Sequence, residues 1–303
     1  MQAAELTPQH RSIDETSALA MTESTLGVGI IGVSPVRGWA AAAHIPALRA
    51  LPNYEIRALS AHSSELARAA GEAFGVSAVY SDHEQLVIRP DIDLVVVTVK
   101  VPQHRELVSA ALAAGKAVYC EWPLGRDVAE AEAMVALAAE KRVRTVVGLQ
   151  ARQAPAIEFV QQLLRDGYVG EVLSTTMVGL SIPGNVIGRP NAYMLDRTSR
   201  ANLLTIPVGH SLDVLTFVLG EFADLSALSD LRRPLITIEE TSEQIVKTSA
   251  DQIAVIGTLV SGATPASTSV RQWQAVPGSC GRSTERTERS GLPLKPRYPK
   301  SIP

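Results

Sequence analysis

The N-terminal half of this sequence alternates short apolar runs with alanine-rich segments of helical periodicity. This alternation requires a mostly parallel sheet with helices on both faces, because each strand returns to the sheet through a helical crossover. The run at 93–99 is almost entirely Val, Leu and Thr, as in strands buried on both faces of such a sheet. We expect strands at 28–33, 54–60, 78–80, 93–99, 117–120 and 145–149, and helices at 39–50, 63–74, 102–114 and 127–141.

A loop with two glycines joins the first strand to the first helix. Gly32 ends the strand, and Gly38 lies just before the helix. Glycine lets backbone approach a phosphate, and a helix N-terminus offers free N–H groups and a positive dipole end. The spacing departs from G-x-G-x-x-G, so the loop indicates a dinucleotide site only together with its strand–helix context. Ser34 can add a hydroxyl, while Arg37 is either a phosphate contact or a solvated charge.

Doubly wound sheets bind their ligands at the carboxyl ends of the strands. The loop after the second strand contains His62, Ser63 and Ser64, and its first carboxylate is Glu65, inside the next helix. An acidic residue in this loop commonly binds the ribose hydroxyls of NAD and would repel a 2′-phosphate. We therefore expect NADP to bind at least as well as NAD, with His62, Ser63 and Ser64 near the phosphate.

The pattern changes near Gln150. Helical spacing is expected at 155–166 and 203–219, extended runs at 170–180, 222–228 and 252–260, and irregular structure at 181–199. This mixture predicts an α+β domain with an open sheet over 151–270, after a Rossmann dinucleotide-binding domain over 25–150.

The two ends of the sequence lack an apolar period. Residues 1–24 are expected to be a disordered lead-in, without the apolar core of a secretory signal. Residues 271–303 are polar and proline-rich and are expected to be disordered. We expect an aberrant tail from a frameshift, a splice variant or a mispredicted gene end, rather than a basic interaction tail. A loss of strands there would leave the sheet of the second domain incomplete, exposing a strand edge and favouring aggregation.

Composition excludes several classes of function. A net charge of −3 and a pI near 6.1 give no basic surface for nucleic acid or membrane. The two cysteines, Cys120 and Cys280, form no disulfide framework and have no metal-ligand spacing, so no metal is expected. No apolar run approaches the ~20 residues that span a bilayer. A cytoplasmic protein is expected, or a nuclear one if it is a eukaryotic regulator.

Several segments together resemble the Gfo/Idh/MocA family, which pairs a Rossmann domain with an open-sheet α/β domain. These segments are Gly29-Ile30-Ile31-Gly32, Thr98-Val99-Lys100-Val101-Pro102-Gln103-His104, the run Gly115-Lys116-Ala117-Val118-Tyr119-Cys120-Glu121-Trp122-Pro123-Leu124, Pro155-Ala156 leading to Asp166-Gly167-Tyr168-Val169-Gly170-Glu171-Val172, and Gly209-His210-Ser211-Leu212-Asp213-Val214-Leu215.

The resemblance implies a bound NADP or NAD. It places His104 beside the nicotinamide ribose, although a helix cap or a surface position is equally open to this residue. Glu121 is expected to hydrogen-bond the cofactor, and Trp122 is either a stacking wall or ordinary core. The expected cofactor-binding residues are Gly32, Ser34, Arg37, Gly38, Trp39, His62, Ser63, Val99, Pro102, His104, Glu121 and Trp122.

The departures from the family concern acid–base chemistry. Trp122 stands where family enzymes have the lysine of Glu-Lys-Pro, and an indole N–H cannot transfer a proton. Ile206 replaces the aspartate four residues before the catalytic histidine, which is retained as His210. His210 is either the general acid/base or a pocket-lining ring satisfied by a local partner such as Asp213.

These departures are similar to the branch of the family that contains the fungal galactose-pathway repressor. Two functions follow from the resemblance. One is an atypical oxidoreductase acting on a sugar or polyol, with His210 as the acid/base. The other is a non-catalytic, dinucleotide-sensing regulator that binds a protein partner. Neither reading includes direct binding to nucleic acid or membrane, and both allow a homo-oligomer.

Overall fold

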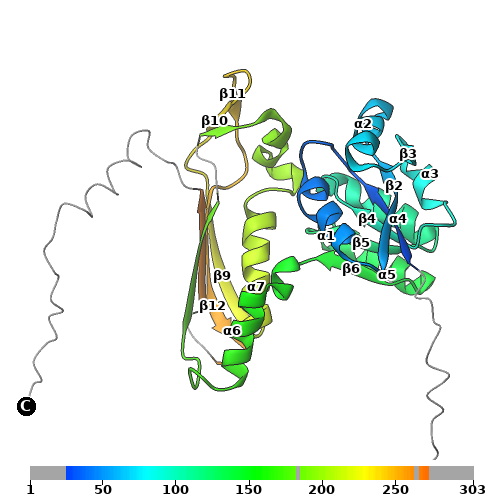
Figure 1. The fold of residues 1–303 in the computed structure, drawn as a ribbon. Helices are drawn as coiled ribbons and strands as arrows, with labels where there is room; N and C mark the ends of the chain where they lie inside the picture. Colours follow the sequence, from blue (N-terminus) through cyan, green and yellow to red (C-terminus); the bar gives the residue numbers. More distant parts are fainter. Residues whose placement is uncertain (1–24, 182–184, 263–265, 273–303) are drawn as a thin grey trace, which may run out of the picture. The chain divides into compact units, whose positions relative to one another are not determined.

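The computed structural model describes residues 25–181, 185–262 and 266–272 (Figure 1). The predicted lead-in at 1–24 and all but the first two residues of the predicted tail at 271–303 lie outside these ranges. Within these ranges no helix is long and apolar enough to cross a membrane.

The described residues form two compact units, each interrupted in sequence. Of the described residues, the first unit takes those up to Thr98 together with Ala110–Tyr119 and Lys141–Arg144, and the second takes Val99–Ser109, Cys120–Glu140 and those from Thr145 onward. The domain boundary expected after residue 150 stays a prediction.

A six-stranded sheet forms the dinucleotide-fold part of the chain. Its strands are β1 (Leu26–Ile31), β2 (Tyr54–Ser60), β3 (Val79–Tyr80), β4 (Leu94–Val97), β5 (Ala117–Glu121) and β6 (Thr145–Gly148), in the order β3-β2-β1-β4-β5-β6. β1 pairs in parallel with β2 and β4, and β2 pairs in parallel with β3. The predicted fold class is confirmed, and the strand order is that of doubly wound dinucleotide-binding sheets.

The helices of this part are η2 (Ala40–His44), α1 (Ile45–Ala50), α2 (Ser64–Phe74), α3 (His83–Val87), η3 (Val101–Gln103), α4 (His104–Ala113) and α5 (Val128–Lys141). The helix expected at 39–50 begins as a π-turn, η2, in which the Ile45 N–H donates to Ala40 O. Pro46 explains the shift, because it has no N–H to donate to Ala42 O and so cannot continue a regular α-ladder.

The core of the first unit fixes the end of β1. Val28 and Ile30 are fully buried and belong to a cluster with Ile45 of α1 and Leu59 of β2. Val95 and Val97 of β4 are fully buried, as the apolar run predicted. This packing holds the chain rigidly up to Gly32, where the glycine loop begins.

The second unit contains a four-stranded sheet and a helical pair. The strands are β7 (Thr175–Ser181), β9 (Phe222–Asp230), β12 (Gln252–Leu259) and β13 (Ala266–Gln272), in the order β7-β13-β12-β9. The helical segments are η4 (Gln150–Gln153), α6 (Pro155–Arg165), η7 (Leu204–Val208) and α7 (Gly209–Leu219). One sheet face packs on the helices through Val255, Leu259 and Leu215, all of which are buried.

The stretch at 181–199, expected to be irregular, is partly regular. It contains β8 (Val186–Ile187) and the 3₁₀ turns η5 (Arg189–Leu195) and η6 (Arg197–Ser199). β8 joins β10 (Leu235–Ile238) and β11 (Gln244–Val246) in a small sheet ordered β11-β10-β8. Ile187 packs there with Leu195 and Ile238. A two-residue strand has no periodicity to read, so only this tertiary cluster reveals it.

Candidate functional site

In the first unit, the carboxyl ends of three strands meet at one point. The N–H groups of Gly32 and Val33 both donate to Ser60 O, at 2.9 and 3.2 Å. Thr98 donates to Ile31 O from its backbone N–H at 2.9 Å and from its hydroxyl at 3.0 Å. The ends of β1, β2 and β4 are therefore tied together at the edge where a doubly wound sheet binds its ligand.

The glycine loop that leaves this edge suits a phosphate group. Gly32 has φ 101° and Gly38 has φ 89°, backbone conformations that favour glycine. Among the described residues, none forms a hydrogen bond with the backbone N–H of Ser34, Arg37 or Gly38. Donors left without a partner in the described part of the chain, on a loop before a helix, fit an oxyanion.

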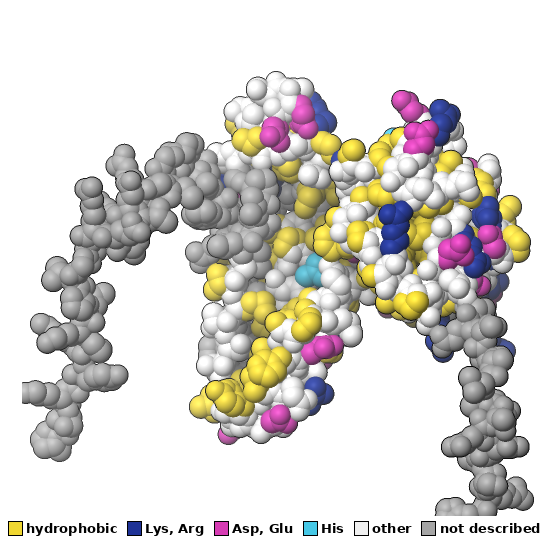
Figure 2. All heavy atoms as spheres, viewed as in Figure 1, with side chains coloured by type: hydrophobic (Ala, Val, Ile, Leu, Met, Phe, Trp, Pro, Cys, Tyr) yellow, Lys and Arg dark blue, Asp and Glu magenta, His cyan; other side chains and the backbone are white. Residues whose placement is uncertain are grey.

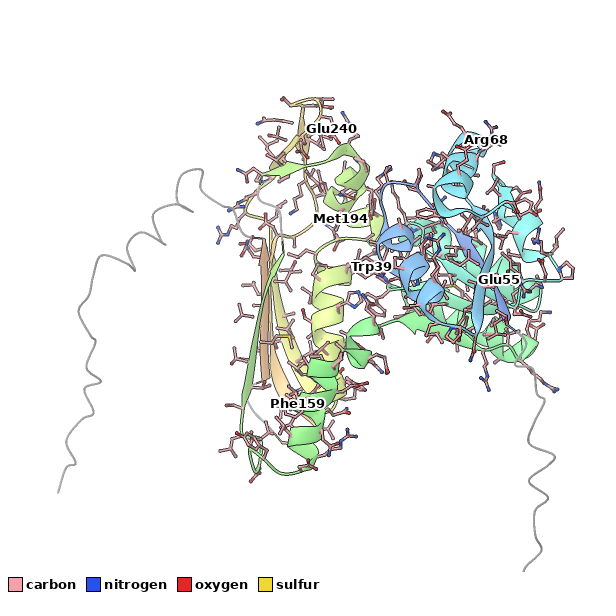
Figure 3. The ribbon with its side chains drawn as sticks, viewed as in Figure 1. Trp39, Glu55, Arg68, Phe159, Met194 and Glu240 are labelled. Carbon is pink, nitrogen blue, oxygen red and sulfur yellow. The ribbon has the colours of Figure 1, made fainter. Side chains whose placement is uncertain are left out.

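The side chains around this loop are open to solvent. Arg37 is exposed, and Trp39, labelled in Figure 3 at the start of the helix, is 48% exposed. His62, in the loop after β2, is also exposed. The Ser63 hydroxyl caps α2 by accepting from the Leu66 N–H at 3.2 Å. The Ser63 O–H remains available to donate to a ligand.

In the second unit, His104 is 1% exposed and links two loops. Its Nδ1 lies 2.8 Å from Pro123 O and its Nε2 lies 3.1 Å from Val99 O. The Cys120 Sγ lies 3.3 Å from the same Nδ1. Carbonyl oxygens only accept, so a neutral ring bonds fully to one of the two at a time. His104 thus joins the segment after β4 to the segment after β5, a role that the sequence did not indicate.

The Trp122 indole contacts the start of α7. Its Nε1–H donates to Thr205 O at 2.7 Å. A Cβ added to Gly209 would lie 2.7 Å from that nitrogen, so the indole packs directly on the glycine backbone. The Trp122 and His210 rings meet edge to face, with centroids 6.4 Å apart. The indole of Trp122 therefore packs against the His210 ring, and the single N–H of the indole is already bonded to the backbone.

His210 is a half-buried imidazole, and none of the described residues hydrogen-bonds to its ring. Burial lowers its pKa, against the opposing effect of the charges on Glu121 and Asp213. The ring is therefore neutral near pH 7 and able to accept a proton.

Asp213 does not satisfy the His210 ring. Its carboxylate instead forms an ion pair with Arg152. The Arg152 Nε lies 3.0 and 3.1 Å from the two carboxylate oxygens, and its Nη2 lies 2.5 Å from Oδ1. Arg152 was not among the residues predicted to matter. No local signal could have identified it, because 61 positions separate the partners in sequence.

The other predicted cofactor residues are dispersed around these groups. Glu121, at the end of β5, is half-buried, and its charge acts on His210. Val99 is half-buried and offers its carbonyl to His104, while Pro102 is exposed on η3. Their contacts with a cofactor stay predictions.

Two family models match consecutive parts of the chain. The oxidoreductase family with an NAD-binding Rossmann fold matches residues 26–149, and the C-terminal domain of Gal80p matches residues 155–279.

Individual relatives include dehydrogenases and regulators. The dehydrogenase aclE of Aspergillus oryzae is 41% identical over 183 residues, which is 60% of this chain and 50% of aclE. The galactose/lactose metabolism regulatory protein GAL80 of Saccharomyces cerevisiae is 27% identical over 264 residues, covering 80% of this chain and 60% of GAL80. The crystal structure of Gal80p from Kluyveromyces lactis superimposes with a TM-score of 0.76 at 27% identity, over 82% of this chain and 64% of that one. The chain thus spans about half to three-fifths of the length of these curated relatives.

Proposed function

We propose that this chain is an oxidoreductase of the family with an NAD-binding Rossmann fold, whose model matches residues 26–149, and that it oxidises a hydroxyl group of a sugar or polyol with His210 as its acid/base. The observation that carries the proposal is the half-buried, neutral imidazole of His210, which has no hydrogen-bond partner among the described residues. An oxidised nicotinamide, when bound, supplies hydride acceptance.

The phosphates of the cofactor are assigned to the glycine loop. The N–H groups of Ser34, Arg37 and Gly38 would hold them, with the Arg37 guanidinium as counter-charge. Without a carboxylate in the loop after β2, His62 and Ser63 accommodate a 2′-phosphate, so NADP binds at least as well as NAD.

His210 performs the proton transfer of the proposed reaction. One imidazole nitrogen accepts the proton of a substrate hydroxyl while the oxygen becomes a carbonyl oxygen. Trp122 contributes no second proton acceptor, because its N–H donates to Thr205 O and its nitrogen has no basic lone pair. We expect slow turnover compared with an enzyme that has both a lysine and a histidine.

The test separates binding from chemistry. Titration of the full chain with NADP and NAD gives the two affinities, and NAD binding more than about tenfold tighter would contradict the assignment of the loop after β2. Incubation with NADP and a panel of sugars and polyols, followed by nicotinamide absorbance, detects turnover. The His210→Ala variant should lose turnover and keep cofactor affinity, while Arg68→Ala, on the exposed face of α2, should keep both.

A non-catalytic regulator is the second candidate function. The Trp122 indole in place of a lysine favours this function. The similarity to GAL80, which extends over four-fifths of this chain, also favours it. Such a protein would bind the dinucleotide and signal to a protein partner. Cofactor binding without turnover on any member of the panel would favour this reading.

We also propose a homo-oligomer in a reducing, cytoplasmic or nuclear compartment. The sheet face away from the helices presents Val178, Leu228 and Ile256, which are more than half exposed. Hydrophobic side chains also reach the surface along α6, where Phe159 is 63% exposed (Figure 2). Cys120 is a free, buried thiol among the described residues. Sedimentation of Ile256→Lys, expected to shift towards monomer, tests the association.

A further inference from the structure

The helix that carries His210 begins with a π-turn, and this turn alters the hydrogen bonding of Thr205. Pro207, inside η7, has no N–H, and Leu203 O accepts from the Val208 N–H at 3.1 Å instead. The Gly209 N–H is directed to the carbonyls of Leu204 and Ile206. In a regular α-helix that N–H would bond to Thr205 O, four residues back. The π-turn therefore releases Thr205 O from its usual partner.

Trp122 supplies the donor that the released carbonyl accepts. The Nε1–H···O distance of 2.7 Å is short for an N–H donor, and the donor comes from a residue 83 positions earlier. A half-buried carbonyl that lacks a hydrogen-bond partner is costly. The bond from the Trp122 indole removes this cost at Thr205 O and so stabilises the π-turn.

Gly209 makes this approach possible. An ideal Cβ at residue 209 would lie 2.7 Å from Trp122 Nε1 and 3.1 Å from both Cε2 and Cζ2. These distances are shorter than a methyl group tolerates without movement of the indole. His210 is the next residue, and its ring meets the same indole edge to face. The π-turn and an indole from 83 positions before Thr205 therefore meet at Gly209, the residue before His210.

We propose that Trp122 is a positioning residue for His210, holding the start of α7 through Thr205 O and Gly209 and thereby fixing the direction of the imidazole. The proposal deepens the function proposed above and rests on it only where turnover is measured. Trp122 acts through another residue, because its own indole N–H donates to backbone and transfers no proton. Replacing Trp122 by lysine should accordingly misplace the His210 imidazole rather than add a working proton-transfer group.

The first test follows the His210 ring directly and needs no activity. NMR titration records the His210 imidazole signal, assigned with His210→Gln, in the wild type and in Trp122→Phe and Trp122→Ala. Each variant should shift the signal, and Trp122→Ala should also raise the titration midpoint, because water replaces the indole. The charged groups that act on the ring, Glu121 and Asp213 with its partner Arg152, are unchanged.

The second test is a double-mutant cycle. Gly209→Ala should shift the His210 signal in the wild-type background and have little effect in the Trp122→Ala background, where the clash is gone. Tyr168→Ala, at an exposed aromatic side chain of the same unit, is the matched control and should leave the signal in place. Circular dichroism verifies that each variant is folded.

The outcomes distinguish the two proposals. If wild-type turnover is found, Trp122→Phe should reduce kcat about tenfold or more with little change in cofactor affinity, as expected for a misplaced acid/base. If no turnover exists, the proposed oxidoreductase fails while the NMR result still decides the role of Trp122. Folded Trp122 variants with an unchanged His210 signal, or additive effects in the cycle, would overturn the positioning role.

Discussion

The exchange of His104 for phenylalanine tests the buried link between the segments after β4 and β5. Phenylalanine keeps the ring and nearly the same volume, so the exchange opens no cavity and its cost reports on hydrogen bonding. In the wild type Pro123 O and Val99 O lie 2.8 and 3.1 Å from the ring nitrogens. In the variant both carbonyls face a ring edge that has no polar donor.

The magnitude follows from the burial of the two carbonyls. An unsatisfied buried acceptor costs about 1–3 kcal/mol, and the contact with Pro123 O is buried on both sides. The contact with Val99 O is only partly buried and contributes less. A neutral ring donates to one carbonyl at a time, which limits the sum. We expect the free energy of unfolding to fall by about 2–3 kcal/mol.

Urea denaturation followed by circular dichroism measures this loss. His62→Phe is the matched control, because His62 is exposed and the same exchange there should change the unfolding free energy by less than about 0.5 kcal/mol. His104→Gln, which retains a donor, should lie between the wild type and His104→Phe. A His104→Phe protein as stable as the His62→Phe control would refute the reasoning.

Three further predictions concern the groups around His210 and Cys120. Burial lowers the pKa of His210 in the folded protein below its ordinary value of 6.5, so the unfolded chain binds more protons near that pH. The free energy of unfolding therefore receives the full contribution of His210 above pH 6.5 and loses it as the pH falls towards the folded pKa. Denaturation midpoints measured across this pH range should decline less steeply in His210→Gln than in the wild type. Asp213→Asn should lower the NMR titration midpoint of His210 further, because it removes a charge that favours protonation. In urea denaturation the same variant should lose about 1 kcal/mol of unfolding free energy, a value discounted for the partial exposure of Arg152. Burial raises the pKa of the Cys120 thiol, so in a Cys280→Ser background a thiol reagent should label the protein only after unfolding; rapid labelling of the folded protein would contradict its burial.

Local sequence patterns predicted the elements of the first half closely. The strand expected at 54–60 is observed as β2 with the same bounds, whereas the capping role of Ser63 became apparent only in the structure. Both π-turns were missed, although each contains or precedes a proline, Pro207 or Pro46. A proline inside a helical pattern indicates an interrupted ladder, but whether the chain kinks, stops or widens depends on which carbonyls find other donors.

The residue types of the site could be predicted, and their contacts could not. Hydrophobic periodicity is a local property, so the sequence by itself determined the parallel sheet and the glycine loop at its edge. The residue types of the site, a histidine at 210 and a tryptophan rather than a lysine at 122, can also be read from the sequence. The tertiary structure alone decided that Arg152 binds Asp213 and leaves His210 without that partner. It alone directed the Trp122 donor to Thr205 O and the His104 ring to two carbonyls. Hydrogen bonds are short and directional, so they depend on the three-dimensional meeting of segments that no local pattern encodes.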